Sequence, residues 1–191
     1  MPHCEATEAS FIGTKLKDKE KEFVFLEQEM PIFNEAEYRK SVGAFATGVV
    51  VVTGIQDQKP LGFAAQSFIS LSLDPPLVAF CPARASSSWP KMRATGRFAV
   101  NILALSQQAT CNAMAQSGDD KFANVDWVPS EGGLPEIVDA LAFLEGDIEA
   151  EHEGGDHTIV VGRVRLHRRH REQHAPLLYF QSAYGSFGKL T

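Results

Sequence analysis

Residues 61–89 of this chain read LGFAAQSFISLSLDPPLVAFCPARASSSW. The small and hydroxylated residues of Leu61–Leu71 are expected to form one strand, and the apolar run Leu77–Cys81 a second, buried strand. Asp74-Pro75-Pro76 must interrupt the ladder between them, because proline donates no backbone hydrogen bond. The three serines Ser86–Ser88 can cap a helix that follows them. This stretch therefore predicts two strands and then a helix.

The rest of the chain is also rich in short strands. The β-branched run Val49–Thr53 predicts a buried strand. A helix is expected over Glu35–Phe45, because Asn34 precedes Glu37 by three residues, as in a capping box, and Gln107–Ala115 also looks helical. Six or seven strands with few helices predict a mainly β fold with a closed sheet, a β-barrel rather than a doubly wound sheet. The further expected strands are Phe98–Leu103, Ala142–Ala150, Thr158–His167 and Leu177–Ser182.

Length and composition predict one domain with an extra arm. The chain has 191 residues, of which 44% are hydrophobic, a normal share for a globular protein. Residues 1–30 are charge-rich, with the run KLKDKEKEF, and are expected to form an arm outside the main core. The domain itself is expected to span residues 31–191.

Charge and cysteine content narrow the function classes. The net charge of −6 argues against nucleic acid or an anionic membrane as the main partner. The basic run Arg165–Arg171 (RLHRRHR) is then interpreted as a solvated strand end. Cys4, Cys81 and Cys111 form no CxxC pair, and an odd count suits a reducing cytoplasm. Cys81 is interpreted as a small buried hydrophobe.

Several motif classes are missing from the sequence. No stretch is long enough for a membrane span, and the N-terminus lacks an apolar signal core. Neither GxGxxG after a strand nor GxxxxGK[ST] occurs, so a Rossmann site and a P-loop are not supported. His152 and His157 are five residues apart across two glycines, which is not the spacing of a helical zinc motif, so no metal site is expected.

Two groups of residues are candidates for ligand binding. Three hydroxyls at a helix start form a ready anion site, to which Arg84 and Arg93 could add charge, although they could also simply cap the helix. The preceding strand combines Gln66 and Ser67 with Phe63 and Phe68, which suits a planar ring bearing amides, although an ordinary strand with one wet face has the same pattern. Together these features indicate redox chemistry on a bound flavin.

His157 is the third candidate. It follows Gly154, Gly155 and Asp156 at the head of the strand IVVGRV. The glycines allow unusual backbone angles and a close approach of a ligand, and Asp156 could orient the imidazole or cap the turn. A histidine on a surface turn with no function is the alternative reading.

At these residues the chain resembles the short flavin reductase family, the reductase components of two-component flavin-dependent monooxygenases. The resemblance covers roughly residues 31–188. The segments that carry it are YRKSVGAFATGVVVVT, GFAAQSFISLSLDPPLVAFCPARASSSW, GRFAVNIL, DKFANVDW, GGLP, GDHTIVVGRV and PLLYFQSAYG. Gln66 stands where many members carry Asn, which leaves the choice between FAD and FMN open.

The resemblance implies an FMN-binding split β-barrel that forms a homodimer. It implies an enzyme in which NADH, or NADPH in some members, reduces FAD or FMN, which then supplies the oxygenase component. His157 would meet the nicotinamide, with Tyr184 near the same pocket, and Lys121 and Phe122 would lie on a loop that closes over the flavin. Ser86, Ser87 and Ser88 would hold the phosphate. The residues expected to line the flavin ring and its ribityl chain are Phe63, Ala65, Gln66, Ser67 and Phe68.

Two alternatives remain open from the sequence. One is a barrel like pyridoxamine-phosphate oxidase, which binds flavin but oxidises an amine. The other is a non-catalytic module that binds flavin or haem. His157 beside its glycines favours the reductase, because a storage protein has no need of a histidine that faces a nicotinamide.

Overall fold

The structure is a computed structural model that describes residues 33–118, 120–170 and 174–188. The arm expected over residues 1–30 therefore lies outside the described residues. The described chain is mainly β, as predicted, and none of its helices is long and apolar enough to cross a membrane. Its elements are α1 (Glu35–Gly43), β1 (Thr47–Gly48), β2 (Val50–Gln56), β3 (Lys59–Ala65), β4 (Ile69–Leu73), β5 (Pro76–Phe80), α2 (Trp89–Arg93), β6 (Arg97–Ile102), η1 (Leu105–Gln107), α3 (Gln108–Ala115), β7 (Trp127–Pro129), β8 (Pro135–Ile137), β9 (Ala142–Gly154), β10 (His157–Arg169), β11 (Leu178–Phe180) and β12 (Ala183–Gly185).

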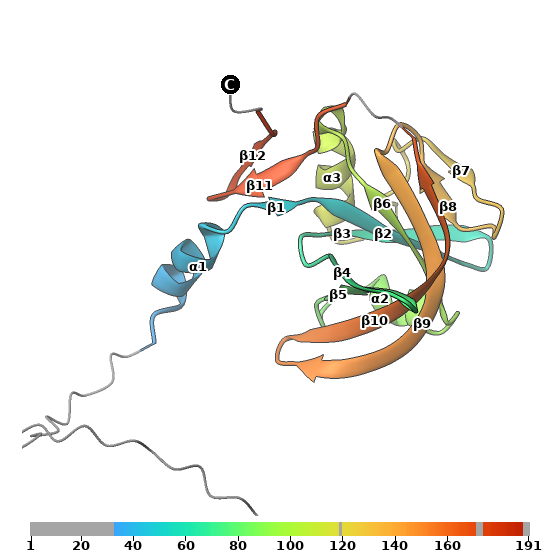
Figure 1. The fold of residues 1–191 in the computed structure, drawn as a ribbon, viewed down its shortest axis with the longest axis horizontal. Coiled ribbons are helices and arrows are strands. Elements are labelled where there is room, and N and C mark those ends of the chain that lie inside the picture. The colour runs from blue at the N-terminus through green and yellow to red at the C-terminus, as the bar shows by residue number, and fades with distance from the viewer. Residues whose placement is uncertain (1–32, 119, 171–173, 189–191) are drawn as a thin grey trace, which may run out of the picture. The chain divides into compact units, whose positions relative to one another are not determined.

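Seven of these strands form the main sheet, in the order β3-β2-β6-β9-β10-β5-β4. The two edge strands, β3 and β4, are neighbours in the chain and are joined by only three residues, 66–68. A sheet whose two edges are tied so closely must curl on itself, and the strongly bent β9 and β10 show this curl (Figure 1). β3 and β4 do not pair with each other, so the curled sheet is open along this seam.

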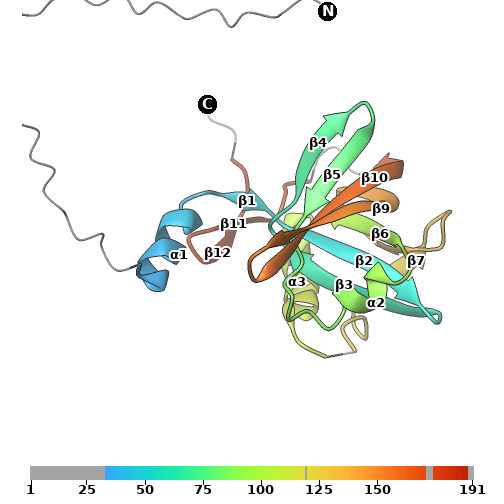
Figure 2. The same ribbon diagram turned by 90° about the horizontal axis from the view of Figure 1, so that it is seen from below.

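The single strand expected over Leu61–Leu71 is therefore wrong. The chain leaves β3 after Ala65 and enters β4 at Ile69, at the opposite edge of the sheet, as the separate β2–β3 and β4–β5 hairpins show in Figure 2. The side chain of Ser67 explains the break. Its Oγ accepts a hydrogen bond from the backbone N–H of Cys81 at 2.9 Å and donates to the Cys81 carbonyl at 3.3 Å, so the segment pairs through a side chain instead of a ladder.

The valine run is buried on both faces, which confirms the predicted buried strand. Val50 and Val52 join an aromatic core that includes Phe63, Phe80 and Phe98. Val49 and Val51 point the other way, against a second core that includes Cys111 and Met114 of α3. Because alternate residues of a strand face opposite sides, a continuous apolar run is what a strand between two cores requires.

A second, three-stranded sheet has the order β1-β11-β12. It continues from the main sheet through Val49, whose N–H donates to the Leu177 carbonyl at 3.1 Å and whose carbonyl accepts from Leu103 at 3.1 Å. The single strand expected over Leu177–Ser182 is wrong, because Gln181 and Ser182 form a turn between β11 and β12. Two-residue hairpin turns are usually marked by an asparagine–glycine pair, which this turn lacks, so the sequence did not indicate it.

The predicted helices are confirmed with shorter bounds. Asn34 caps α1 as expected, since its side chain accepts from the N–H groups of Ala36 and Glu37, but the helix ends at Gly43 rather than Phe45. α2 has only five residues, and α3 begins after the short η1 turn. Cys81 is half-buried rather than fully buried, so its interpretation as an ordinary core residue is wrong.

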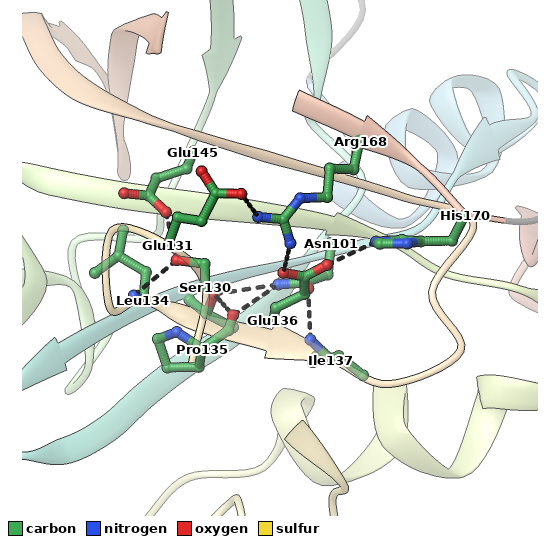
Figure 3. Close-up of polar contacts among 11 residues, drawn as sticks. Asn101, Ser130, Glu131, Leu134, Pro135, Glu136, Ile137, Glu145, Arg168 and His170 are labelled. Atoms are coloured by element: carbon green, nitrogen blue, oxygen red, sulfur yellow. Dashed lines mark hydrogen bonds and ion pairs between the residues drawn. The ribbon is translucent and has the colours of Figure 1, made fainter. Parts of the chain in front are cut away.

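Buried polar contacts hold the β7–β8 hairpin against the main sheet (Figure 3). The amide of Asn101, fully buried on β6, donates to Thr53 at 3.1 Å and accepts from the N–H of Ile137 at 2.8 Å. Buried Glu145 on β9 accepts from Ser130 and pairs with Arg97. These contacts satisfy groups that would be costly to bury alone.

The basic run at the end of β10 takes part in the same arrangement. Arg168 pairs with Glu131 and buried Glu136 at 2.9 and 2.8 Å, and His170 approaches Glu136 at 2.7 Å. Arg165 pairs with Asp147 across the strands. These described residues of the run meet carboxylates of the same chain, which agrees with the interpretation of the run as a strand end.

Candidate functional site

A pocket of about 790 Å³ lies at the open seam of the barrel. Its wall includes the end of β3 with the residues that follow it, the segment after β5, the start of β10, the last turn of α3, and the β11–β12 hairpin. The size falls in the range of cavities that hold cofactors and drug-sized ligands. The two segments that the sequence singled out, 61–89 and 154–158, therefore meet here.

The seam side of the pocket combines an aromatic ring with polar groups. Phe63 and Ala65 line it from β3, and Gln66 and Ser67 line it from the segment after β3. Gln66 Oε1 accepts a hydrogen bond from the Thr47 hydroxyl at 3.4 Å. Phe68, in contrast, packs against the aromatic core and is not part of the wall.

The three serines divide between two roles. Ser86 and Ser87 line the pocket, and Ser86 Oγ also accepts the N–H of Trp89, the first residue of α2, at 3.2 Å. Ser88 is buried and donates to the Gly62 carbonyl at 2.9 Å. It is not part of the wall, and its hydroxyl proton is already engaged.

His157 reaches the pocket because the β9–β10 turn is tied to the segment after β5. The N–H of Arg84 donates to the Asp156 carbonyl at 2.9 Å, and the N–H of Thr158 donates to the Pro82 carbonyl at 3.0 Å. Gly155 has a φ of +72°, which a residue with a side chain rarely adopts. His157 is thereby placed beside Ala83, near the serines.

Asp156 orients the imidazole. Its Oδ1 lies 2.8 Å from His157 Nδ1, and this hydrogen bond lowers the pKa of the Asp156 carboxyl below its ordinary value, helped by the charge of the histidine when protonated. An ionised carboxylate can only accept, so Nδ1 carries a proton. In the neutral imidazole, Nε2 is then the acceptor.

The opposite side of the pocket comes from α3 and the loop after it. Cys111 and Met114 contribute from the helix, and Lys121 from the loop. The Lys121 ammonium donates to the carbonyls of Gly62 at 3.3 Å and Met114 at 3.2 Å, so it joins the end of α3 to β3. Phe122 lies behind this side, against the second core and edge-on to Trp127, and is not part of the wall.

Two tyrosines of the β11–β12 hairpin complete the wall. Tyr179 and Tyr184 are cross-strand partners whose rings meet edge-on at 5.1 Å. The Tyr184 hydroxyl lies 3.3 Å from Cys111 Sγ, which together with burial raises the pKa of Tyr184 to about 12. Burial also raises the pKa of the Cys111 thiol, so both groups stay protonated near neutral pH.

The structure thus gathers nine of the twelve residues predicted from the sequence into one wall. Phe68, Ser88 and Phe122 lie outside it. The residues that sequence reasoning missed include Cys81, Cys111, Met114 and Tyr179. Tyr179 could have been found from the LYFQSAYG segment, had its short hairpin been recognised; the other three look like core residues in the sequence. The nine that line the pocket are Phe63, Ala65, Gln66, Ser67, Ser86, Ser87, Lys121, His157 and Tyr184.

The two arginines considered for the anion site are directed elsewhere. Arg84 pairs with Glu153 at 3.3 Å and Arg93 with Glu151 at 2.5 Å, and neither lines the pocket. Over residues 33–118, 120–170 and 174–188, no group of three or more His, Cys, Asp and Glu side chains is placed to hold a metal ion. The pocket itself is concave, and its wall mixes apolar side chains with hydroxyls, as in sites that bind organic cofactors.

The fold and its pocket together define a ligand-binding β-barrel. Comparison with known proteins identifies the family of barrels to which the chain belongs. A family model described as "Flavin reductase like domain" matches residues 42–188. The chain is 44% identical to the reductase subunit HsaB of a flavin-dependent monooxygenase from Rhodococcus jostii, over 77% of this chain and 75% of that protein.

Solved structures agree. Nitrilotriacetate monooxygenase component B from Mycobacterium thermoresistibile is similar with a TM-score of 0.77 and 42% identity, over 80% of this chain and 86% of that one. The NADH:FAD oxidoreductase SgcE6 from Streptomyces globisporus, solved with NAD and FAD fragments, is similar with a TM-score of 0.77 and 36% identity, over 81% and 93%. The chain belongs to the flavin reductase like family, which confirms the resemblance read from its motifs.

Proposed function

We propose that this protein is an NADH-dependent flavin reductase that supplies reduced flavin to the oxygenase component of a two-component monooxygenase. The observation that carries the proposal is the pocket at the barrel seam, where the two sequence segments typical of the family form one wall. Named relatives are reductase components of this kind, which supports the same conclusion.

The residues present fit a flavin. Phe63 and Ala65 offer an apolar surface for a planar ring, and Gln66 and Ser67 offer polar groups to its edge. The hydroxyls of Ser86 and Ser87 lie together on the wall, where they would donate to a phosphate. A bound flavin accepts a hydride from a reduced nicotinamide, and the protein orients the two rings.

His157 is the residue proposed to position the nicotinamide. With Nδ1 held by Asp156, Nε2 of the neutral ring accepts hydrogen bonds, and the carboxamide of a nicotinamide is a suitable N–H donor. His157 therefore needs no proton transfer of its own. Its proposed contribution is orientation of the donor ring.

The proposal includes a homodimer and a cytoplasmic location. The dimer is supported by the family and by three exposed apolar residues on the edge strand β4, namely Ile69, Leu71 and Leu73, which are 56%, 46% and 91% exposed. The location is supported by the odd cysteine count without a CxxC pair. The choice between FAD and FMN stays open, because Gln66 replaces the more usual asparagine.

The first experiment measures NADH oxidation at 340 nm with no flavin, with FMN and with FAD. We expect oxidation only when a flavin is present, faster with NADH than with NADPH. An amine oxidase of the barrel class or a storage protein would show no flavin-dependent loss of NADH, and that result would contradict the proposal.

The second experiment tests the phosphate contacts. The double substitution Ser86→Ala and Ser87→Ala should weaken FMN binding, because each lost hydrogen bond to a charged group costs about 1.5–3 kcal/mol. Riboflavin, which lacks the phosphate, should bind almost as tightly as it does to the unaltered protein. Equal weakening of FMN and riboflavin would mean that these serines only support the fold. Ser88→Ala is the matched variant, and we expect it to affect stability rather than the difference between the two flavins.

A further inference from the structure

The β11–β12 hairpin forms one wall of the pocket but has little backbone support. Among the described residues, β12 pairs with β11 alone, through three residue pairs, and β11 reaches β1 through two. Gln181 and Ser182 in the turn have φ values of +46° and +64°, which residues with side chains adopt at a cost. The backbone also holds the hairpin at its turn, where the N–H of Gln181 donates to the Gly43 carbonyl at 3.0 Å, but short hairpins of this kind are marginal without side-chain contacts.

The Tyr184 hydroxyl supplies such a contact. It donates to Asn112 Oδ1 on α3 at 3.1 Å and lies 3.3 Å from Cys111 Sγ on the same helix. A phenol has one proton, which it can donate to Asn112 Oδ1 or to Cys111 Sγ, and in the contact with Cys111 either atom can be the donor. The Tyr184 hydroxyl thus joins the hairpin to two neighbouring residues of α3, Cys111 and Asn112.

Asn112 is not itself part of the pocket wall. Its side chain lies on the exposed face of α3, whereas Cys111 and Tyr184 line the pocket. A tyrosine hydroxyl keeps its proton near neutral pH, so it can donate to Asn112 throughout the working range. Asn112 lines a neighbouring pocket of about 590 Å³ that shares Gln116, Ser117, Gly118 and Lys121 with the first, and its hydrogen bond to a residue of the first pocket's wall is the one with Tyr184.

We propose that Asn112 is a positioning residue that holds Tyr184, and with it the β11–β12 wall, at the place where the flavin and nicotinamide bind. This inference rests on the proposed function in that it takes the pocket to be the site of both ligands. The anchor itself depends only on the contacts between α3 and the hairpin.

The kinetic test is a double-mutant cycle with Asn112→Leu, Tyr184→Phe and both together. Each single variant should raise KM for NADH or Kd for FMN by about twofold to tenfold, the value of one hydrogen bond, with a smaller change in kcat. The double variant should be no worse than the more affected single one, because both remove the same contact. Additive effects of the two substitutions would overturn the proposal.

The second measurement needs no activity. Hydrogen exchange at the amides of residues 178–185 should rise in both single variants, because the hairpin opens more often without its anchor. Gln108→Leu is the matched control, since Gln108 is exposed one turn earlier on the same face of α3 and lies outside the pocket. Unchanged exchange in both Asn112→Leu and Tyr184→Phe would overturn the anchor. Absence of flavin-dependent NADH oxidation in the unaltered protein would instead contradict the proposed function. The hydrogen-exchange measurement would then still decide whether Asn112 anchors the hairpin.

Discussion

Several polar side chains of the pocket are held in place by backbone groups or by other side chains before any ligand arrives. Ser67 is held by both backbone groups of Cys81, Lys121 by two carbonyls, and His157 by Asp156. A site held in this way loses little conformational entropy when it binds, which favours both affinity and correct orientation. These fixed side chains are suited to orienting ligands rather than to supplying an acid or a base.

His157→Ala should lower kcat/KM for NADH by roughly tenfold or more, because an orienting contact acts in the transition state as well as in the bound state. Flavin affinity should change little. The measurement is stopped-flow reduction of bound flavin over a series of NADH concentrations. His152→Ala is the matched control, because His152 is exposed on β9 and does not line the pocket. Reduction rates for His157→Ala equal to those of the unaltered protein would return His157 to the role of a surface-turn residue.

Loss of the Tyr184 proton should lower the stability of the folded protein at alkaline pH. The folded pKa of Tyr184, about 12, exceeds the ordinary value of about 10. The unfolded chain therefore loses this proton first as pH rises. The stabilising contribution is present below about pH 10 and is lost as pH rises toward 12.

The measurement is the melting temperature of the unaltered protein and of Tyr184→Phe from pH 8 to 11. The difference between them should shrink or reverse above pH 10. A constant difference across this range would contradict the raised pKa. Because the chain has only three tyrosines, absorbance of tyrosinate can follow the same group directly.

At the scale of elements, the long β9–β10 hairpin does most to place the site. Its 13-residue strands shift register between Val161 and Gly162 and again between Val164 and Leu166, which lets them bend around the core. At the first shift the Phe98 ring lies against Gly162, where a Cβ would come within 2.2 Å of the ring. The tip of the same hairpin carries His157 to the pocket.

Gly162→Ala should destabilise the protein by about 1–3 kcal/mol, because Phe98 is fully buried and cannot move away from the added methyl group without disturbing the core. Chemical denaturation measures the free energy of unfolding. Gly48→Ala is the matched control in a strand, since its added Cβ would meet nothing within 4 Å. Equal stability of the two variants would show that the bend of β10 can absorb the methyl group.

At the scale of the whole described molecule, opposite charges pair along the outside of the barrel. Arg163 pairs with Glu149, and Arg93 and Arg84 pair with Glu151 and Glu153 on the same strand. Surface pairs of this kind, several of them only partly exposed, contribute little stability each, but they neutralise cations that could otherwise attract nucleic acid. The exposed side chains of Ile69, Leu71 and Leu73 on β4 are different, because they are apolar and take no part in this charge pairing.

We expect light scattering to give about twice the monomer mass of 20.9 kDa at micromolar concentration. Leu73→Lys should shift the equilibrium toward the monomer, because Leu73 is 91% exposed on the edge strand. Val128→Lys, on β7, is the matched control with a half-exposed apolar residue. A monomer mass for the unaltered protein would contradict the dimer, and a dimer that tolerates Leu73→Lys would remove β4 from the interface.

The sequence by itself determined the fold class and the family, and nine of the twelve residues that it singled out line the pocket. Strand patterns depend on local alternation, and the family motifs are contiguous, so Val49–Thr53, Ser86–Ser87 and Gly155–His157 could be recognised without coordinates. Their physical requirements are local: β-branched residues for a buried strand, hydroxyls for a helix cap, and glycine for a turn with positive φ.

Only the tertiary structure decided which side chains face the pocket and which support it. Ser87 and Ser88 are adjacent, yet one lines the pocket and the other donates to Gly62, because that choice depends on the position of β3. The split of residues 61–71 into β3 and β4 follows from pairing with strands distant in the chain. Asn112 gains its contact with Tyr184 across a separation of 72 residues. Contacts made over such distances leave no local pattern in the sequence, since they depend on how the elements pack.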